Sequence, residues 1–332
     1  MADQVRKLAA QYFQLVDPAQ LDLPPGNVLV RSAVQDALYE RMFDESLAPL
    51  PPAAYRTRVL KLVTARIEES IVDPDQDELS DNLMNSLGTL VAQPKPSALE
   101  QVQQLSHVKY TAPLPSPLTG DREVTTIESR GLLLSGRTTG NRTWEAALHL
   151  GSFLCSPAGE ALVRGKRVIE LGAGTGFLSL LCARHLGARG VVASDREPVL
   201  IENMRECVRF NHDGEKPFPF HPAAWDWGTP LEKTGDLEEF VEGGGIETYD
   251  ADIIPPLLST VRDLFENYYL EEFIISVTLR NERTFQTFWD GCEQNAFKVE
   301  TLPYESTPSE SQSGFFHSTD IPIRTYRISK AL

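Results

Sequence analysis

Apolar residues recur at helical spacing through the first third of the chain. They do so in four stretches, at residues 5–16, 30–38, 55–71 and 79–91, and each stretch gathers its apolar side chains on one stripe. Because a lone amphipathic helix is only marginally stable in water, we expect about four helices to pack together. The pattern therefore predicts an all-helical N-terminal domain over residues 1–92.

The periodicity stops after residue 92. Residues 93–121 carry five prolines and little pattern, which indicates a Pro-rich linker with a short strand at 108–111. From residue 122 onward, short apolar runs alternate with amphipathic stretches. Strand-like runs lie at 122–136, 168–171, 190–194, 218–224 and 273–279, helical stretches at 177–186, 198–210 and 252–270, and a closing strand pair at 297–304 and 321–328. This alternation predicts an α/β domain over residues 122–332.

The strand at 168–171 stops at a glycine-rich turn. Gly172, Gly174 and Gly176 follow Glu170 closely, with Phe177 opening the next helix. Glycine lets backbone N–H groups approach a ligand, and the carboxyl end of such a strand faces the crevice where open α/β sheets bind small molecules. The spacing is G-x-G-x-G, whereas dinucleotide-binding folds need G-x-G-x-x-G. Glu170 would repel a pyrophosphate but suits a ligand that carries an amino group and a sulfonium.

A second acidic residue ends the next strand. Asp195 follows Gly176 by 19 residues, where a carboxylate can accept hydrogen bonds from both hydroxyls of a ribose. The alternative is a glycine turn of another doubly wound protein, with Asp195 only capping the following helix. Taken together, Glu170, the three glycines and Asp195 resemble the class I, seven-β-strand methyltransferases that use S-adenosylmethionine. The resemblance implies a Rossmann-like fold and that cofactor.

Two tryptophan-containing motifs flank the glycine turn. In the first, Thr139 to Ala147, Thr143 is expected to cap a helix, and Trp144 is either a core residue or lies at the lip of the cleft near a sulfonium. This T-G-x-x-x-W-x-A-A element resembles the family-16 protein methyltransferases, which implies that Trp144 belongs to the cofactor pocket. In the second motif, Trp225 to Gly228, an indole can stack on adenine and Asp226 can accept from its amine. The resemblance points to Trp227, with Trp225 as second choice, and a hydrophobic plug is the alternative.

The stretch 231–250 departs from the expected pattern. A fourth buried strand should end here, yet Gly243 to Gly245 interrupt the few apolar residues. We therefore expect a short, irregular or damaged strand. Tyr249 and Asp250 match the family pattern, whereas Ile246 stands where the family has Asp and Glu247 follows one place later. This departure favours, as an alternative, a methyltransferase-fold binding protein with weak or no catalysis.

Further segments narrow the resemblance. Tyr249 to Leu257, Thr278 to Asn281 and the helical extension, together with the motifs above, resemble the eukaryotic elongation factor 2 lysine methyltransferases. The resemblance implies a cytoplasmic protein-lysine N-methyltransferase acting on elongation factor 2. Tyr249 would orient the substrate nitrogen, with loop packing as the alternative, and Asp250 or Glu247 would hold the incoming ammonium. A nicotinamide-dependent oxidoreductase is a further alternative.

Composition narrows the choice of partners. The 332 residues carry a formal charge of −16, which argues against a general nucleic-acid surface. No apolar run approaches 18 residues and the N-terminus lacks a signal-peptide core, so we expect no membrane partner. The four cysteines form no C-x-x-C pair and are expected to be buried free thiols rather than metal ligands. Oligomeric state is not indicated by the sequence.

Overall fold

The computed structural model describes residues 2–73, 77–94, 97, 100, 104–113, 120–129, 139–212, 214, 218–230, 243–247 and 254–330, with only the backbone described for 243–247. The chain divides into two compact units. Unit 1 comprises Met1–Thr111 with Ser129–Leu132, and unit 2 comprises Ala112–Glu128 with Leu133–Leu332.

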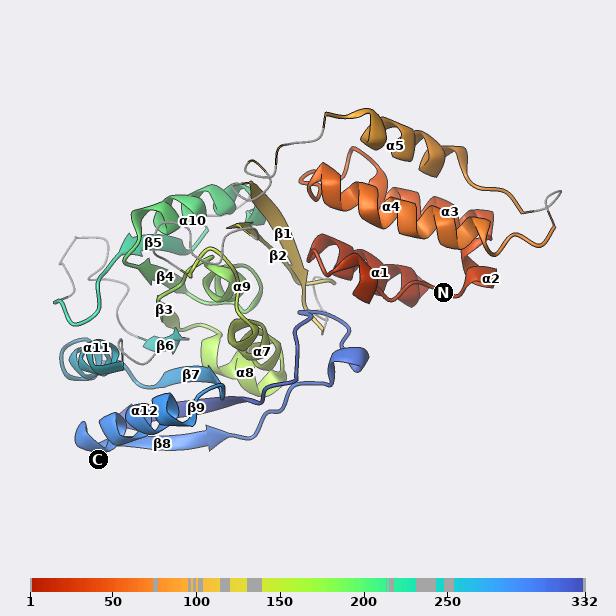
Figure 1. Cartoon of the computed structure of the whole chain (residues 1–332). Coiled ribbons are helices and arrows are strands. Elements are labelled where there is room, and N and C mark those ends of the chain that lie inside the picture. The colour runs from red at the N-terminus through yellow and green to blue at the C-terminus, as the bar shows by residue number, and fades with distance from the viewer. Residues whose placement is uncertain are drawn as a thin grey trace. The chain divides into compact units, whose positions relative to one another are not determined.

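Unit 1 is predominantly helical (Figure 1). Its elements are α1 (Ala2–Phe13), the 3₁₀ turn η1 (Pro18–Gln20), α2 (Gly26–Leu29), α3 (Ser32–Leu38), the π-helical turn η2 (Tyr39–Phe43), α4 (Ala53–Glu68), α5 (Asp81–Ala92) and the strand β1 (Leu105–Thr111). The predicted helical stripes are buried, with Leu8, Tyr12, Leu38 and Val59 at 0% exposure. The expected strand at 108–111 is confirmed and begins earlier, at Leu105.

One buried amide ties the loop before α5 to α3. The side chain of Gln35 is fully buried, and its Nε2 donates to the carbonyls of Val30 (3.2 Å) and Glu78 (2.9 Å). Its Oε1 accepts from the amide of Ser80 (2.8 Å). A buried polar group is stable only when it is paired, and the two bonds to Glu78 and Ser80 hold the loop against α3.

Unit 2 is built on a seven-stranded sheet with the strand order β5-β4-β3-β6-β7-β9-β8. The strands are β3 (Arg167–Leu171), β4 (Gly190–Asp195), β5 (Phe220–Ala224), β6 (Gly243–Glu247), β7 (Phe273–Thr278), β8 (Phe297–Leu302) and β9 (Ile323–Lys330), with β2 (Glu123–Ser129) outside this sheet. The first five strands pair in parallel, and β9 pairs antiparallel with both β7 and β8. The Rossmann-like seven-stranded fold and its closing antiparallel pair are confirmed.

Helices cover both faces of this sheet (Figure 1). They are α7 (Glu145–Leu154), α8 (Pro157–Val163), α9 (Phe177–His185), α10 (Pro198–Asn211), α11 (Ile254–Asn267) and α12 (Glu282–Gln294). The short 3₁₀ turn η4 (Ser309–Ser311) lies in the connection between β8 and β9. Ile169, Leu171 and Ile275 pack with α11 and α12 in one buried core. Because side chains alternate along a strand, Glu170 points to the opposite face, where it meets α9.

Within the irregular stretch 231–250, residues 243–247 form strand β6. As expected, the strand is short, with five residues. The glycines that interrupt the apolar residues are themselves part of the strand, because Gly243 to Gly245 pair with β3, and Gly245 to Glu247 pair with β7. Glycine has no side chain to contribute to an apolar pattern, so the pattern did not reveal the strand. Tyr249 and Asp250 lie outside the described residues.

Candidate functional site

A cavity of about 890 Å³ lies at the carboxyl edge of the parallel strands. The turns that follow β3, β4, β5 and β7 all contribute to its wall, as does the start of α7. This volume is in the range of small-molecule sites, and the edge is where open α/β sheets bind their ligands.

The glycine turn forms one wall. Gly172 and Gly174 line the cavity, with φ angles of 68° and 53° that favour glycine. A Cβ on Gly174 would lie 3.0 Å from the carbonyl oxygen of Gly140, so the close approach of these two segments also requires glycine. Gly176 (φ 74°) is instead the cap residue of α9 and packs against Met204. At these two glycines the turn presents backbone, not side chains, to the cavity.

Asp195 lies on the same wall and is buried, at 8% exposure. Its two carboxylate oxygens accept from the amides of Gly174 (2.9 Å) and Glu197 (3.1 Å). The cap position of α10 is Glu197, so Asp195 joins the glycine turn to the segment leading into that helix. Burial raises the pKa of Asp195, against the opposing effect of these amides. A carboxylate has about four acceptor sites, which leaves capacity for a ligand hydroxyl.

Glu170 is the second buried carboxyl of the cavity wall, at 5% exposure. Its Oε2 accepts from the amide of Ser179 at 2.9 Å. Burial raises the pKa of Glu170 to about 8, and the nearby charge of Asp195 acts in the same direction. A ligand cation in the cavity would favour the ionised carboxylate, so this position suits a positively charged group.

Trp144 lies half-buried on the cavity wall at the start of α7. Its indole N–H donates to the carbonyl of Thr139 (3.2 Å), and the guanidinium of Arg280 stands 5.4 Å from its ring centroid. The same guanidinium pairs with Glu145 at 3.0 Å. These contacts join the first turn of α7 to the segment after β7, across the cavity wall.

The expectation that Thr143 caps α7 is wrong. The cap residue is Trp144, and no side chain caps this helix end. Thr143 Oγ1 instead donates to the buried carboxylate of Glu128 (2.7 Å) and lies 2.7 Å from the hydroxyl of Thr175. Since Thr143 has only one hydroxyl proton, Thr175 donates to it. The residue therefore fixes the glycine turn.

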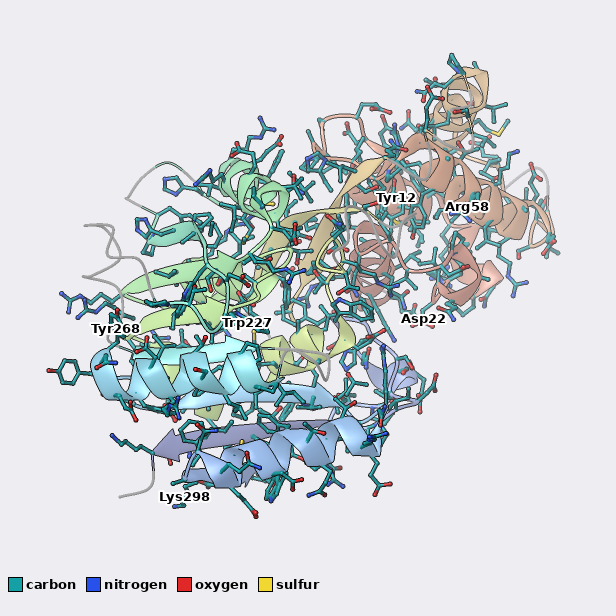
Figure 2. All side chains as sticks on the ribbon, turned by 60° about the vertical axis from the view of Figure 1, so that its left-hand side comes forward. Tyr12, Asp22, Arg58, Trp227, Tyr268 and Lys298 are labelled. Carbon is teal, nitrogen blue, oxygen red and sulfur yellow. The ribbon has the colours of Figure 1, made fainter. Side chains whose placement is uncertain are left out.

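The second tryptophan motif follows β5. Trp225, Asp226 and Trp227 all line the cavity, with Trp225 buried, Trp227 half-buried and Asp226 exposed. The ring N–H of Trp225 donates to the carbonyl of Thr229 at 3.2 Å. Trp227 lies beside the start of α11 (Figure 2), and the next amide, of Gly228, donates to Thr260 Oγ1 at 2.8 Å. Trp225 belongs to the buried core and Trp227 packs against it, so both line the cavity while also filling the space beside it. The choice of Trp227 over Trp225 stays a prediction.

The substrate-side predictions are described only in part. Glu247 ends β6 opposite Ile275 of β7, at the carboxyl edge of the sheet. Sequence reasoning missed several cavity-lining residues near the end of β7 and the start of α12, namely Ser276, Val277, Thr284 and Phe285. The sequence analysis used the segment Thr278 to Asn281 for the family resemblance but assigned it no role. The position of this segment directly after a buried strand could have indicated that it lines the cavity.

All four cysteines are buried free thiols. Within the described residues, no group of His, Cys, Asp or Glu side chains is arranged to hold a metal ion. Over the same residues, no helix has both the length and the apolar character needed to cross a bilayer.

Comparison with known proteins gives a consistent assignment. Residues 134–294 match a protein family described as lysine methyltransferase. The chain is 38% identical to the protein-lysine N-methyltransferase EFM3 of Chaetomium thermophilum, over 98% of both chains. It is 28% identical to EFM3 of Saccharomyces cerevisiae, over 63% of this chain and 66% of that one. It is 24% identical to the human protein-lysine N-methyltransferase EEF2KMT, over 77% of this chain and 75% of that one.

The cavity also fits the methyl donor of such enzymes. S-adenosylmethionine carries a sulfonium, an ammonium, a ribose diol and a flat adenine. The wall offers the buried carboxyl of Glu170 for a cation, acceptor capacity on Asp195 for hydroxyls, and indole rings for the adenine. The chain belongs to the lysine methyltransferase family, and it is an S-adenosylmethionine-dependent protein-lysine methyltransferase.

Proposed function

We propose that the substrate of this enzyme is a lysine of elongation factor 2, and that the enzyme acts in the cytoplasm. The proposal is supported by the segments Tyr249 to Leu257 and Thr278 to Asn281, which resemble the elongation factor 2 lysine methyltransferases. Similarity to the human protein EEF2KMT, which extends over 77% of this chain, supports it further.

Each part of the cavity wall has a proposed role in holding the cofactor. Gly172 and Gly174, with Gly176 shaping the turn, bring the backbone close to the ligand, and Asp195 accepts from the ribose hydroxyls. Glu170 faces the positively charged methionine portion. The observation that carries these assignments is that two buried carboxyls and the glycine turn share one cavity.

Aromatic residues complete the proposed cofactor site. Trp227 stacks on the adenine, and Asp226 accepts from the adenine amine. Trp144 packs near the sulfonium, where its ring attracts a cation. The position of Trp144 on the cavity wall, half-buried at the start of α7, supports this role.

When bound, S-adenosylmethionine supplies a methyl group on a positively charged sulfur. What the protein must do is align the acceptor nitrogen and keep water out. A lysine with the ordinary pKa of about 10.4 is neutral in roughly one molecule in 2,500 at pH 7. Removal from water lowers that pKa, and Val277 and Phe285 give the cavity wall an apolar portion. In our proposal Tyr249 orients the nitrogen, and Asp250 or Glu247 holds the arriving ammonium.

The test is methylation of purified elongation factor 2 with tritiated S-adenosylmethionine, with the labelled lysine identified by mass spectrometry. We expect one lysine to carry the label and its replacement by arginine to abolish labelling. Elongation factor 1A, a second translation factor, serves as the control substrate. Labelling that persists in full after the arginine replacement, or labelling of elongation factor 1A alone, would show that the substrate assignment is wrong while leaving the methyltransferase activity intact.

A further inference from the structure

A chain of hydrogen bonds runs from the cavity wall into the interior of unit 2. Ser276 Oγ lies 2.6 Å from Thr325 Oγ1, which lies 3.2 Å from His149 Nε2. On the other side of that ring, His149 Nδ1 lies 2.6 Å from Ser306 Oγ, which lies 3.0 Å from His317 Nε2. Ser276, Thr325 and His149 are each at 0% exposure. Four successive hydrogen bonds thus join β7, β9, α7 and the segment that follows β8.

The inner end of the chain determines which atoms donate. His317 Nδ1 lies 2.7 Å from the carbonyl oxygen of Phe315, which can only accept, so Nδ1 carries a proton. Burial lowers the pKa of His317, against the opposing effects of its hydrogen bond to the Phe315 carbonyl and of the nearby Glu145. Burial, together with repulsion from a protonated His317, lowers the pKa of His149 to about 4. Both rings are therefore neutral at pH 7, and Nε2 of His317 is an acceptor.

The remaining donors follow one by one. Ser306 donates its only hydroxyl proton to His317 Nε2, so it accepts from Nδ1–H of His149. The neutral ring of His149 then accepts at Nε2 from the hydroxyl of Thr325. Thr325 has no second proton, so Ser276 donates to it. The hydroxyl proton of Ser276 is therefore used in the hydrogen bond to Thr325. The oxygen of Ser276 can still accept a hydrogen bond from another group.

The position of Ser276 explains why that capacity matters. Ser276 is among the residues that line the cavity. The sheet register places Glu170 of β3 level with Ile246 of β6, and Ile246 level with Ile274 of β7. Ser276 lies two residues further toward the carboxyl edge than Ile274, on the same face of the sheet as Glu170. This is the part of the cavity that suits a positively charged ligand.

We propose that Ser276 Oγ accepts a hydrogen bond from an amino group bound in the cavity, and that Thr325, His149, Ser306 and His317 hold the hydroxyl in this accepting orientation. The amino group belongs either to the methionine portion of the cofactor or to the methyl-accepting lysine. The proposal does not depend on which protein supplies that lysine.

The direction of the chain is tested first, by nitrogen-15 NMR of the histidines in the wild-type protein at pH 7. We expect His149 and His317 each to carry a proton on Nδ1 and none on Nε2. A proton on Nε2 of either ring would reverse the order of donors and overturn the proposal. This measurement needs no variant and no substrate.

The contact with an amino group is tested by calorimetry on Ser276→Ala with three ligands. S-adenosylhomocysteine carries the methionine amino group, sinefungin carries that group and a second amine at the methyl position, and methylthioadenosine carries neither. A lost hydrogen bond to a charged amine weakens binding by about tenfold or more. If the methionine amine is the partner, both amino-acid ligands weaken alike and methylthioadenosine does not change. If the acceptor position is the partner, sinefungin weakens more than S-adenosylhomocysteine.

Matched variants separate positioning from packing. Thr325→Val keeps the shape of the side chain but removes the hydroxyl, and we expect it to reproduce the losses of Ser276→Ala. Thr325→Ser restores the hydroxyl and should restore affinity. Tyr304→Phe is the control, since its ring lies 5.0 Å from that of His149 but outside the chain, and it should bind all three ligands like wild type. Unchanged affinities in both Ser276→Ala and Thr325→Val would overturn the proposal.

Discussion

Glu170→Gln replaces the buried carboxyl of the cavity wall by a group that resembles its protonated form. The glutamine oxygen can still accept from the amide of Ser179, now at 2.9 Å from the carboxylate, so the fold of the turn should persist. Burial raises the pKa of Glu170 to about 8. The wild-type carboxyl is then about 1% ionised at pH 6 and about 24% ionised at pH 7.5.

These fractions set the size of the effect. If only the ionised carboxylate stabilises the bound cation, the affinity for S-adenosylmethionine rises about 25-fold between pH 6 and 7.5, or about 1.9 kcal/mol. A bound cation favours loss of the Glu170 proton, so the affinity for S-adenosylmethionine increases as the pH rises toward 8. The pH range of the measurement ends at 7.5 because the amino group of the ligand itself loses its proton close to pH 7.7–8.0.

The same shift predicts a change in stability. The folded protein holds the Glu170 proton more tightly than the unfolded chain, whose carboxyl has the ordinary value of 4.5. The resulting stabilisation is fully present below pH 4.5 and is lost as the pH rises toward 8, by roughly 3 kcal/mol at pH 7. Glu170→Gln should therefore be more stable than wild type at pH 7 in the absence of ligand, as measured by urea denaturation.

The binding assay is calorimetric titration with S-adenosylmethionine at pH 6.0, 6.5, 7.0 and 7.5. Glu170→Gln should bind weakly and with little dependence on pH. The control is Glu202→Gln on α10, which makes the same change of charge at a carboxyl that is 73% exposed. A Glu170→Gln variant that keeps both the wild-type affinity and the wild-type rise in affinity with pH would contradict the role of Glu170 in binding a cation.

Three further variants test other parts of the molecule. Asp195→Ala should weaken S-adenosylhomocysteine binding by at least about 100-fold in calorimetry without unfolding the unit, because it removes an ionised acceptor for the ribose; near-normal affinity would contradict the assignment. Gly174→Ala forces a side chain onto a residue with φ 53°, 3.0 Å from Gly140 O, so urea denaturation should show a loss of about 1–2 kcal/mol together with weaker binding; unchanged stability would argue against the turn geometry. Gln35→Leu leaves the amide of Ser80 without its acceptor and should lower the free energy of unfolding of unit 1 by about 1–3 kcal/mol. The control is Gln93→Leu at an exposed position. If Gln35→Leu costs no more stability than this control, the hydrogen bonds of Gln35 do not stabilise unit 1.

Much of this protein could be predicted from short-range pattern. The strands at Arg167–Leu171 and Gly190–Asp195 are apolar runs bounded by turns, and the stripes of unit 1 recur with helical spacing. Glu170, Gly172, Gly174 and Asp195 are recognisable because each stands at a fixed distance from the end of a strand. In a parallel sheet, strand ends meet at one edge, so such residues are brought together by the fold class alone.

Other features were misread because local pattern is ambiguous. Threonine is a residue type that often caps helices. The hydroxyl of Thr143 instead bonds to the buried carboxylate of Glu128, 15 residues earlier, because charge-assisted hydrogen bonds are stronger than neutral ones. Strand β6 contains three glycines, and it lies between β3 and β7 through backbone pairing on both sides.

The sequence by itself determined the fold class, the glycine turn and the acidic residues at the strand ends, because these depend on spacing along the chain. Only the tertiary structure brought Ser276, Thr325, His149 and Ser306 into one hydrogen-bonded chain, since Ser276 and Thr325 are 49 residues apart and His149 and Ser306 are 157 apart. The raised pKa of Glu170 likewise exists only in the folded protein, because it comes from burial rather than from any neighbour in sequence.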